Sequence, residues 1–242
     1  MEENRKPRPA LILLNRGEKI AGWIYFPFYI FLISVIVAII FRILGRDLMA
    51  PNNLLYMNLI YGAINFVVLA ACFHRFLGKS FRQAKHFPGR FFAAVGIGFA
   101  IYYLGTVLIS SLIQFIQPGL ENINDANLAG IAQHGMLLMV LYTVLLVPTV
   151  EELMFRGLIF TSIRPHSRFL AYFVSMFAFA VMHVLGYLGS YPVGTLALCF
   201  LQYLPAGFAL AWAMEYSGSI WASICVHTVV NTVAMLAMAF MK

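Results

Sequence analysis

The sequence predicts an all-α fold, a polytopic transmembrane helix bundle with about seven membrane-spanning helices. Of its 242 residues, 62% are hydrophobic and only 10% are charged, a composition typical of membrane proteins. The apolar residues are grouped in runs of the length that a hydrocarbon core requires, ~20 residues for each helix. Cys72, Cys199 and Cys225 all fall within these runs and share no short spacing, so neither a disulfide framework nor a cysteine zinc site is indicated.

The apolar runs define the expected helices in order. We expect spans at residues 20–44, 53–77, 91–116, 135–163, 168–188, 192–214 and 219–240. The first run is too long for the core of a cleaved signal peptide, which indicates a retained helix. Since no repeat, low-complexity tract or linker separates the spans, we expect residues 1–242 to form a single membrane-embedded domain.

The segments between the spans carry their own signals. The basic connector 77–90, with its interleaved phenylalanines, is typical of a segment lying on an anionic lipid surface. Segment 117–134 contains no Lys or Arg, which indicates an outer loop. Pro165 should end the fourth span, and Ser167 and Ser219 can cap the helices that follow them.

The fourth span is longer than a bilayer requires. Its ~29 residues correspond to ~43 Å of helix, so it must tilt, kink or project from the membrane. Pro148 lacks an N–H and leaves the Val144 carbonyl without its helical hydrogen bond. This favours a kinked or locally opened helix beside a cavity.

The formal net charge of +7 is a topology signal. With the N-terminus cytoplasmic, thirteen basic residues lie on or toward the cytoplasmic side: Arg5, Lys6, Arg8, Arg16, Lys19, Arg75, Lys79, Arg82, Lys85, Arg90, Arg156, Arg164 and Arg168. The three that go outward are Arg42, Arg46 and Lys242. Because the positive-inside rule favours this distribution, the basic charge indicates orientation in a membrane and no nucleic-acid partner.

The fourth span also contains three charged residues, Glu151, Glu152 and Arg156. One acid or base at the centre of a bilayer costs ~2.5 to 3.5 kcal/mol, so three of them within six residues require partners and a purpose. Glu152 and Arg156 are i,i+4 neighbours and can neutralise each other. Glu151 has no polar neighbour at i±3 or i±4 and must find its partner on another helix.

Three further polar residues are expected at a similar depth. Measured from the cytoplasmic helix ends at 1.5 Å per residue, Glu151 lies ~20 Å deep, His183 ~22 Å, His227 ~12 Å and Asn231 ~18 Å. Phe179 precedes His183 by four residues, as His227 precedes Asn231, so each pair shares one helix face. Three helices thus bring a carboxylate, two imidazoles and an amide to one layer.

These groups fit two kinds of hydrolytic chemistry. A Glu beside a neutral His can accept a proton from water, and a second His with an Asn can hydrogen-bond the oxyanion that forms when the water attacks a carbonyl. The same side chains, Glu151, His183 and His227, could instead bind zinc. The spacing leaves both open, although Asn231 suits an oxyanion better than a metal, and we therefore expect no cofactor, with zinc as the alternative.

Each feature also has a purely structural interpretation. A single histidine inside a membrane is more often a hydrogen-bonded packing residue than a catalyst, and Glu152 with Arg156 could be only a structural ion pair. The occurrence of such polar residues on three different spans favours a functional site over the structural interpretation.

The ordered motifs resemble those of the CPBP family, the CAAX proteases and bacteriocin-processing enzymes that are also called Abi. The motifs are EExxxR at residues 151–156, FxxxH at 179–183 and HxxxN at 227–231, each on a separate helix. The stretch 207–231, which contains EYSGSIWASICVHTVVN, is similar to the family's final motif region. The resemblance covers about 137–231.

The resemblance implies an intramembrane endopeptidase of the glutamic type, with an active site open to the cytoplasm. Glu151 and His183 would activate water, while His227 and Asn231 would stabilise the oxyanion. Glu152, Arg156 and Phe179 would support them, and we assign the ion pair a structural and electrostatic role because its charges are paired within one helix.

The expected substrate is a peptide or a membrane protein. Prenyl-protein members of the family have a further span after the last motif, whereas this chain ends eleven residues past Asn231. This difference argues against assigning their prenylated substrate to this chain. From the short length and the absence of extra eukaryotic-style loops, we expect a multi-pass protein of a bacterial plasma membrane, acting in bacteriocin or signalling-peptide processing or in immunity. The alternative is a non-catalytic membrane partner that binds a peptide or a sensor protein. A transporter is disfavoured because the two halves of the chain lack matching broken helices.

Overall fold

The computed structural model describes residues 9–240, and within this range the regular structure is helical, with no β-strand. Seven helices are long and apolar enough to cross a membrane: Arg16–Ile43, Pro51–Cys72, Pro88–Ile116, Met136–Ile163, Arg168–Leu185, Val193–Ser217 and Ile220–Phe240. The predicted all-α bundle of seven spans is confirmed, with helix ends that differ from the expected ones by a few residues.

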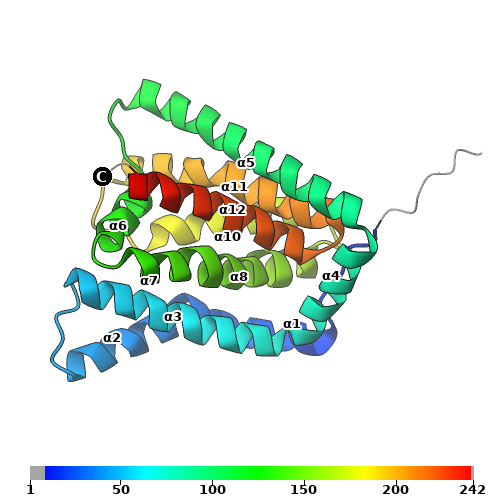
Figure 1. Ribbon diagram of the computed structural model, residues 1–242, viewed down its shortest axis with the longest axis horizontal. Helices are drawn as coiled ribbons and strands as arrows, with labels where there is room; N and C mark the ends of the chain where they lie inside the picture. The colour runs from blue at the N-terminus through cyan, green and yellow to red at the C-terminus, as the bar shows by residue number, and fades with distance from the viewer. Residues whose placement is uncertain (1–8, 241–242) are drawn as a thin grey trace, which may run out of the picture.

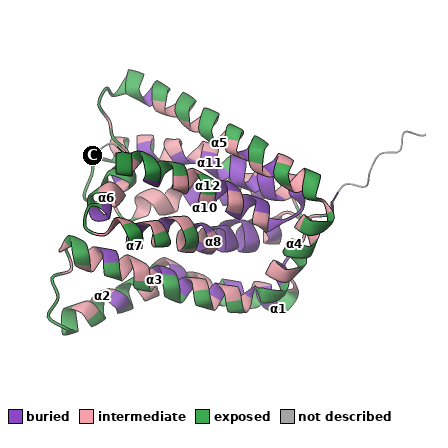
Figure 2. Ribbon diagram, in the orientation of Figure 1, coloured by how far each residue is buried: buried purple, intermediate pink, exposed green. Residues whose placement is uncertain are grey.

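The spans form a layered bundle (Figure 1). The centre contains α8 (Val147–Glu152), α10 (Arg168–Leu185), α11 (Val193–Ser217) and α12 (Ile220–Phe240). On one side α5 (Pro88–Ile116) packs against α11 and α12. The opposite side is formed by the first two spans, α1 (Arg16–Pro27), α2 (Ile33–Ile43) and α3 (Pro51–Cys72), of which α3 contacts α8. Figure 2 shows that buried residues concentrate in the central helices, whereas the outer faces of α2 and α5 are exposed.

The fourth span is irregular along most of its length. It begins with α7 (Met136–Val140) and passes through a π-helical segment, Leu141–Leu146, before α8. A second π-helical segment, Leu153–Phe160, leads to α9 (Thr161–Ile163). The wider π turns fit the expectation of a locally opened helix around Pro148.

Two connections contain helices that the sequence did not predict. The basic connector forms α4 (His74–His86), which begins directly after the second span ends at Cys72. Phe76 and Ser80 of α4 are fully buried against the bundle. Segment 117–134 contains α6 (Ile123–Ala132), capped by the Asn122 side chain. Each of these two segments therefore contains a helix that packs against the bundle, where only a connector and a loop were expected.

The expected helix caps are present. The Ser167 hydroxyl accepts the backbone N–H of Leu170, and the Ser219 hydroxyl accepts that of Trp221. Gly218 ends α11 with φ of 74°, a left-handed conformation that favours glycine.

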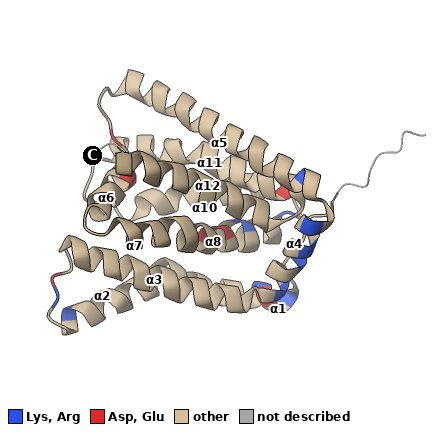
Figure 3. Ribbon diagram, in the orientation of Figure 1, with Lys and Arg blue, Asp and Glu red and all other residues tan. Residues whose placement is uncertain are grey.

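Basic side chains gather at one end of the bundle, which we call the basic end (Figure 3). These residues lie in the first turn of α1, along α4, near the start of α5 and between α9 and the first residue of α10: Arg16, Lys19, Arg75, Lys79, Arg82, Lys85, Arg90, Arg164 and Arg168. Arg42, in the last turn of α2, and Arg46, in the connection that follows it, lie at the opposite end, where α6 also lies. Arg5, Lys6, Arg8 and Lys242, which contribute to the orientation argument, lie outside the described residues. The orientation itself remains a prediction.

Candidate active site

The pair formed by Glu152 and Arg156 lies at the centre of the bundle. An Arg156 nitrogen is 3.0 Å from a Glu152 oxygen, and both side chains are completely buried. Arg156 also donates to the Gly207 carbonyl at 3.0 Å, and its guanidinium lies 4.4 Å from the ring centre of Phe179. A Cβ at position 207 would lie 2.9 Å from Met176 Cα, so glycine permits the close approach of α10 and α11 here.

Glu152 has two further partners, both on α12. The Ser223 hydroxyl donates to one carboxylate oxygen, and His227 Nδ1 lies 3.0 Å from the other. The expectation that the ion pair is satisfied within one helix is therefore incomplete. Glu152 also orients the imidazole of His227, because a carboxylate cannot donate and so receives the Nδ1–H.

The hydrogen bonds of the two histidines leave equivalent nitrogens available. His183 Nδ1 lies 2.8 Å from the Phe179 carbonyl oxygen, which can only accept, so this nitrogen carries the proton. In the neutral imidazoles of His183 and His227, each Nε2 therefore presents a lone pair. Both Nε2 atoms face the same carboxylate, that of Glu151.

Glu151 is positioned between the two imidazoles. Its Oε2 lies 3.8 Å from His227 Nε2 and 4.0 Å from His183 Nε2, too far for direct hydrogen bonds. This oxygen is buried and has no hydrogen-bond partner among residues 9–240. A water molecule that donates its two protons could bridge two of these three acceptor atoms once the side chains part to admit it, since Oε2 has almost no accessible surface.

Asn231 lies one turn beyond His227 and contacts the opened part of the fourth span. Its Nδ2 donates to the Thr143 carbonyl at 2.8 Å. The hydroxyl of Thr228 donates to the Val144 carbonyl at 3.2 Å, which gives a partner to the group that Pro148 deprives of its helical bond. The structure thus brings Glu151, His183 and His227 together, while one amide proton of Asn231 is engaged elsewhere.

Sequence reasoning missed two contributors. Ser223 precedes His227 by four residues, so the helical periodicity that paired His227 with Asn231 could have identified it. Tyr203 of α11 stacks on His183 with ring centres 4.0 Å apart, and no local pattern marks it. Its hydroxyl lies 2.9 Å from Asn122 Oδ1 and 3.1 Å from an oxygen of Asp125 in α6. The surrounding protein desolvates the Asp125 carboxyl and raises its pKa.

The spacing of the acid–base groups differs from that of zinc ligands. No group of three or more His, Cys, Asp or Glu side chains in the described chain is arranged as a metal site. Zinc bonds of 2.0–2.2 Å in a tetrahedron place ligand atoms about 3.4 Å apart, so Glu151 and the two imidazoles would need to close by several tenths of an ångström. The contact between Glu152 and His227 resembles the carboxylate–histidine pairs that orient zinc ligands. Glu151 Oε2 would therefore have to approach both Nε2 atoms before the three groups could share a zinc ion.

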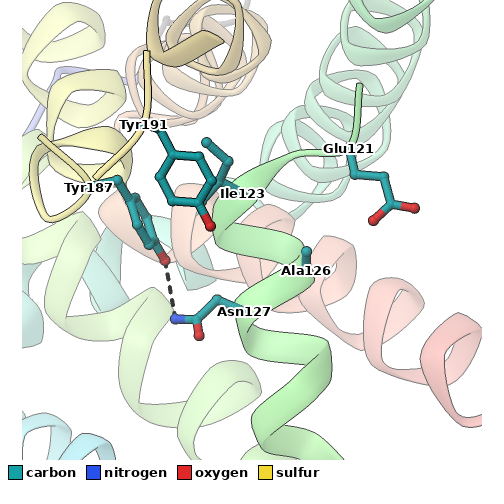
Figure 4. A pocket seen from close by; sticks show the side chains of 6 residues that line it. All are labelled: Glu121, Ile123, Ala126, Asn127, Tyr187 and Tyr191. Atoms are coloured by element: carbon teal, nitrogen blue, oxygen red, sulfur yellow. Dashed lines mark hydrogen bonds between the residues drawn. The ribbon is translucent and has the colours of Figure 1, made fainter. Parts of the chain in front are cut away.

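A cavity of about 420 Å³ lies between α6 and the connection from α10 to α11 (Figure 4). The Asn127 amide donates to the Tyr187 hydroxyl at 3.2 Å across its edge. The lining residues are Glu121, Ile123, Ala126, Asn127, Tyr187 and Tyr191. None of them belongs to the acid–base group, so this cavity is separate from the candidate active site.

The fold and the buried acid–base group define the class: a multi-pass membrane protein in which three apolar helices bring polar side chains together in the interior. Residues 133–233, which contain every predicted site residue, match the family model described as type II CAAX prenyl endopeptidase Rce1-like. This match confirms the resemblance to the CPBP family and supports a protease. Searches of curated proteins and of solved structures gave no match.

Proposed function

We propose that this protein is an intramembrane endopeptidase that hydrolyses peptide bonds with a water molecule activated by Glu151. The observation that carries the proposal is the position of Glu151 Oε2, which is buried, lacks a hydrogen-bond partner within residues 9–240 and faces the Nε2 atoms of His183 and His227. A carboxylate oxygen in this position can act as a general base and accept a proton from water.

In the proposed reaction, the water donates one proton toward Glu151 and the other toward His183 Nε2. As its oxygen bonds to the peptide carbonyl carbon, the proton passes to Glu151, which later gives it to the leaving nitrogen when the C–N bond breaks. Asn231 has a second amide proton available for the oxyanion. His227 can donate to it from Nε2 only in the form that has already taken up a proton from the solvent, because both protons of the reacting water are used by Glu151 and His183.

The substrate in this proposal is a peptide or a membrane protein that enters from the lipid bilayer. The basic end faces the cytoplasm, since it carries nine of the twelve described basic residues, with Arg156 buried and Arg42 and Arg46 at the other end. We include a bacterial plasma membrane and a role in bacteriocin or signalling-peptide processing or immunity in the proposal, on the basis of the motif resemblance.

The test is the variant Glu151→Gln, which keeps the size of the side chain but removes the base. We expect peptide products to fall by about 10²- to 10⁴-fold while the protein stays inserted and folded. Comparative peptidomics of membranes and medium from cells expressing each form measures the products. Glu121→Gln, in the loop before α6, is the matched control and should retain the wild-type products. Unchanged products in Glu151→Gln would contradict the catalytic assignment, and absence of products in the wild type would favour a non-catalytic binding partner.

A further inference from the structure

A second cavity lies at the basic end, far along the helices from the acid–base group. Its volume is about 330 Å³, and it is formed where α5 and α10 begin and α11 ends. The residues that line it are Pro9, Leu11, Arg90, Arg164, Arg168, Trp212, Glu215 and Tyr216. Three guanidinium groups and one carboxylate therefore share one concave surface, which leaves an excess of two positive charges.

The carboxylate of Glu215 is already saturated with donors. Arg164 Nε donates to Oε1, and Arg168 Nε and the Tyr172 hydroxyl donate to Oε2 at 3.0 and 2.6 Å. Glu215 therefore holds the two arginines in place without consuming all of their N–H groups. This group of three charged residues differs from Glu152 and Arg156, which form a buried pair of one negative and one positive charge.

Each arginine of the cavity keeps donors available. Arg90 uses Nε and Nη2 for the Tyr216 carbonyl, and its guanidinium lies 4.2 Å from the ring centre of Tyr216. Within residues 9–240, no partner exists for Nη1 of Arg90, for either Nη of Arg164 or for Nη1 of Arg168. The Arg164 and Arg168 side chains are 33% and 67% exposed, so these donors are accessible from the cavity.

An apolar stripe begins at the residue that follows Arg168. Phe169, Phe173 and Phe177 succeed one another at one-turn intervals on α10, with ring centres 6.2 and 5.9 Å apart. They are 75%, 47% and 47% exposed on the outer surface of a membrane-spanning helix. A molecule with a charged head in the cavity could thus lay a hydrocarbon chain along α10.

We propose that this cavity binds the phosphate of an anionic phospholipid, with an acyl chain against the stripe of phenylalanines. Guanidinium groups bind phosphate oxygens through paired N–H donors, and basic pockets between membrane helices favour anionic headgroups. The excess of two positive charges matches a lipid that carries more than one negative charge better than a zwitterionic lipid. The site is distinct from the proposed active site and does not depend on its function.

The experiment measures lipid binding to the purified full chain in detergent by native mass spectrometry and by thermal shift. The probes are phosphatidic acid, phosphatidylcholine with the same acyl chains, and inorganic phosphate. We expect phosphatidic acid to bind and to raise the melting temperature, and the other two probes to have little effect. Arg168→Gln should weaken phosphatidic acid binding by about tenfold through the loss of a charge-assisted contact.

Two further variants separate the cavity from general charge effects. Arg82→Gln removes one charge from the exposed face of α4 at the same end and should leave binding within about twofold of the wild type. Glu215→Gln keeps an acceptor for Arg164 but removes the competing negative charge, so it should strengthen binding. Equal weakening by Arg82→Gln and Arg168→Gln would overturn the proposal, as would weaker binding in Glu215→Gln that remains folded. Stabilisation by inorganic phosphate equal to that by phosphatidic acid would assign the cavity to free phosphate and overturn the lipid.

Discussion

At the residue scale, Glu152 connects the charge of the fourth span to the chemistry of α12. Its carboxylate is fully buried and accepts from three donors, Arg156, Ser223 and His227, so each of its two oxygens has at least one partner. A buried charge with this many partners is tolerated, whereas one that loses its counter-charge is strongly destabilising. The same contacts turn His227 Nε2 toward Glu151, so stability and site geometry depend on one carboxylate.

Arg156→Ala tests this dependence. The variant strands the buried Glu152 and exposes the Gly207 carbonyl to a cavity, so we expect the free energy of unfolding to fall by about 3 to 5 kcal/mol. Equilibrium unfolding in detergent measures the loss. Arg75→Ala, on the exposed face of α4, is the control and should change stability by less than about 0.5 kcal/mol. A similar small change for both variants would mean that Glu152 obtains its compensation from another source.

The sequence identified the residues whose presence in a membrane is costly, because the cost depends only on side-chain type and on hydropathy. Glu151, His183 and His227 were recognised in this way, and the structure places them around one point. Tyr203 could not be recognised, because tyrosine is tolerated in apolar helices and its stacking on His183 is a tertiary contact. Local periodicity carries no information on which helix faces meet.

At the element scale, the opened fourth span depends on α12. Pro148 cannot donate to the preceding turn, and the π-helical segment before it shifts the remaining bonds. Asn231 and Thr228 supply side-chain donors to the Thr143 and Val144 carbonyls. The kink was predictable from the proline, but the origin of the replacement donors was not, since it depends on the packing of a distant helix.

Asn231→Leu should destabilise the protein by about 1 to 3 kcal/mol, because it leaves the buried Thr143 carbonyl without a donor. The Val147 N–H bonds to the Tyr142 carbonyl, five residues back, so an N–H restored at position 148 by Pro148→Ala would reach the Thr143 carbonyl in the same register. The cost of Asn231→Leu should therefore fall in the Pro148→Ala background. A double-mutant cycle of unfolding free energies in detergent measures this coupling.

Thr232→Val is the control for this cycle. The Thr232 hydroxyl donates only to the Thr228 carbonyl within its own helix, so we expect little effect in either background. Additive costs for Asn231→Leu and Pro148→Ala would show that the amide does not replace the bond that the proline removes.

The helices α4 and α6 illustrate why short elements escape prediction. Both lie in polar segments, where hydropathy indicates only that the chain leaves the membrane. The helix α6 is ordered by contacts of Asn122 and Asn124 with Tyr203 and of Asn127 with Tyr187. The helix α4 is fixed by Glu18, which accepts the Phe76 N–H, and by Ser219, which donates to the Ser80 carbonyl. All of these partners are distant in sequence.

At the scale of the whole molecule, the bilayer makes the fold predictable. The thickness of the hydrocarbon core fixes the length of each span, and the charge distribution orders the spans by side. Helical rise then converts sequence position into depth, which is why Glu151, His183 and His227 were expected in one layer. The rotation of each helix about its axis is not fixed in this way, and it decides that Asn231 contacts Thr143.

The choice between the two hydrolytic mechanisms also belongs to the whole protein, because metal content is a property of the purified chain. If Glu151, His183 and His227 hold zinc, the protein should contain about one zinc per chain, and a strong chelator should remove activity until zinc is restored. If Glu151 acts as the proton acceptor, the protein should contain well under one metal per chain and remain active after chelation. We expect the second result, because Asn231 is a poor zinc ligand and its free amide proton suits an oxyanion. Elemental analysis together with turnover before and after chelation makes the measurement, with Glu151→Gln as the inactive reference. Stoichiometric zinc that is lost and regained together with activity would assign the site to the metal.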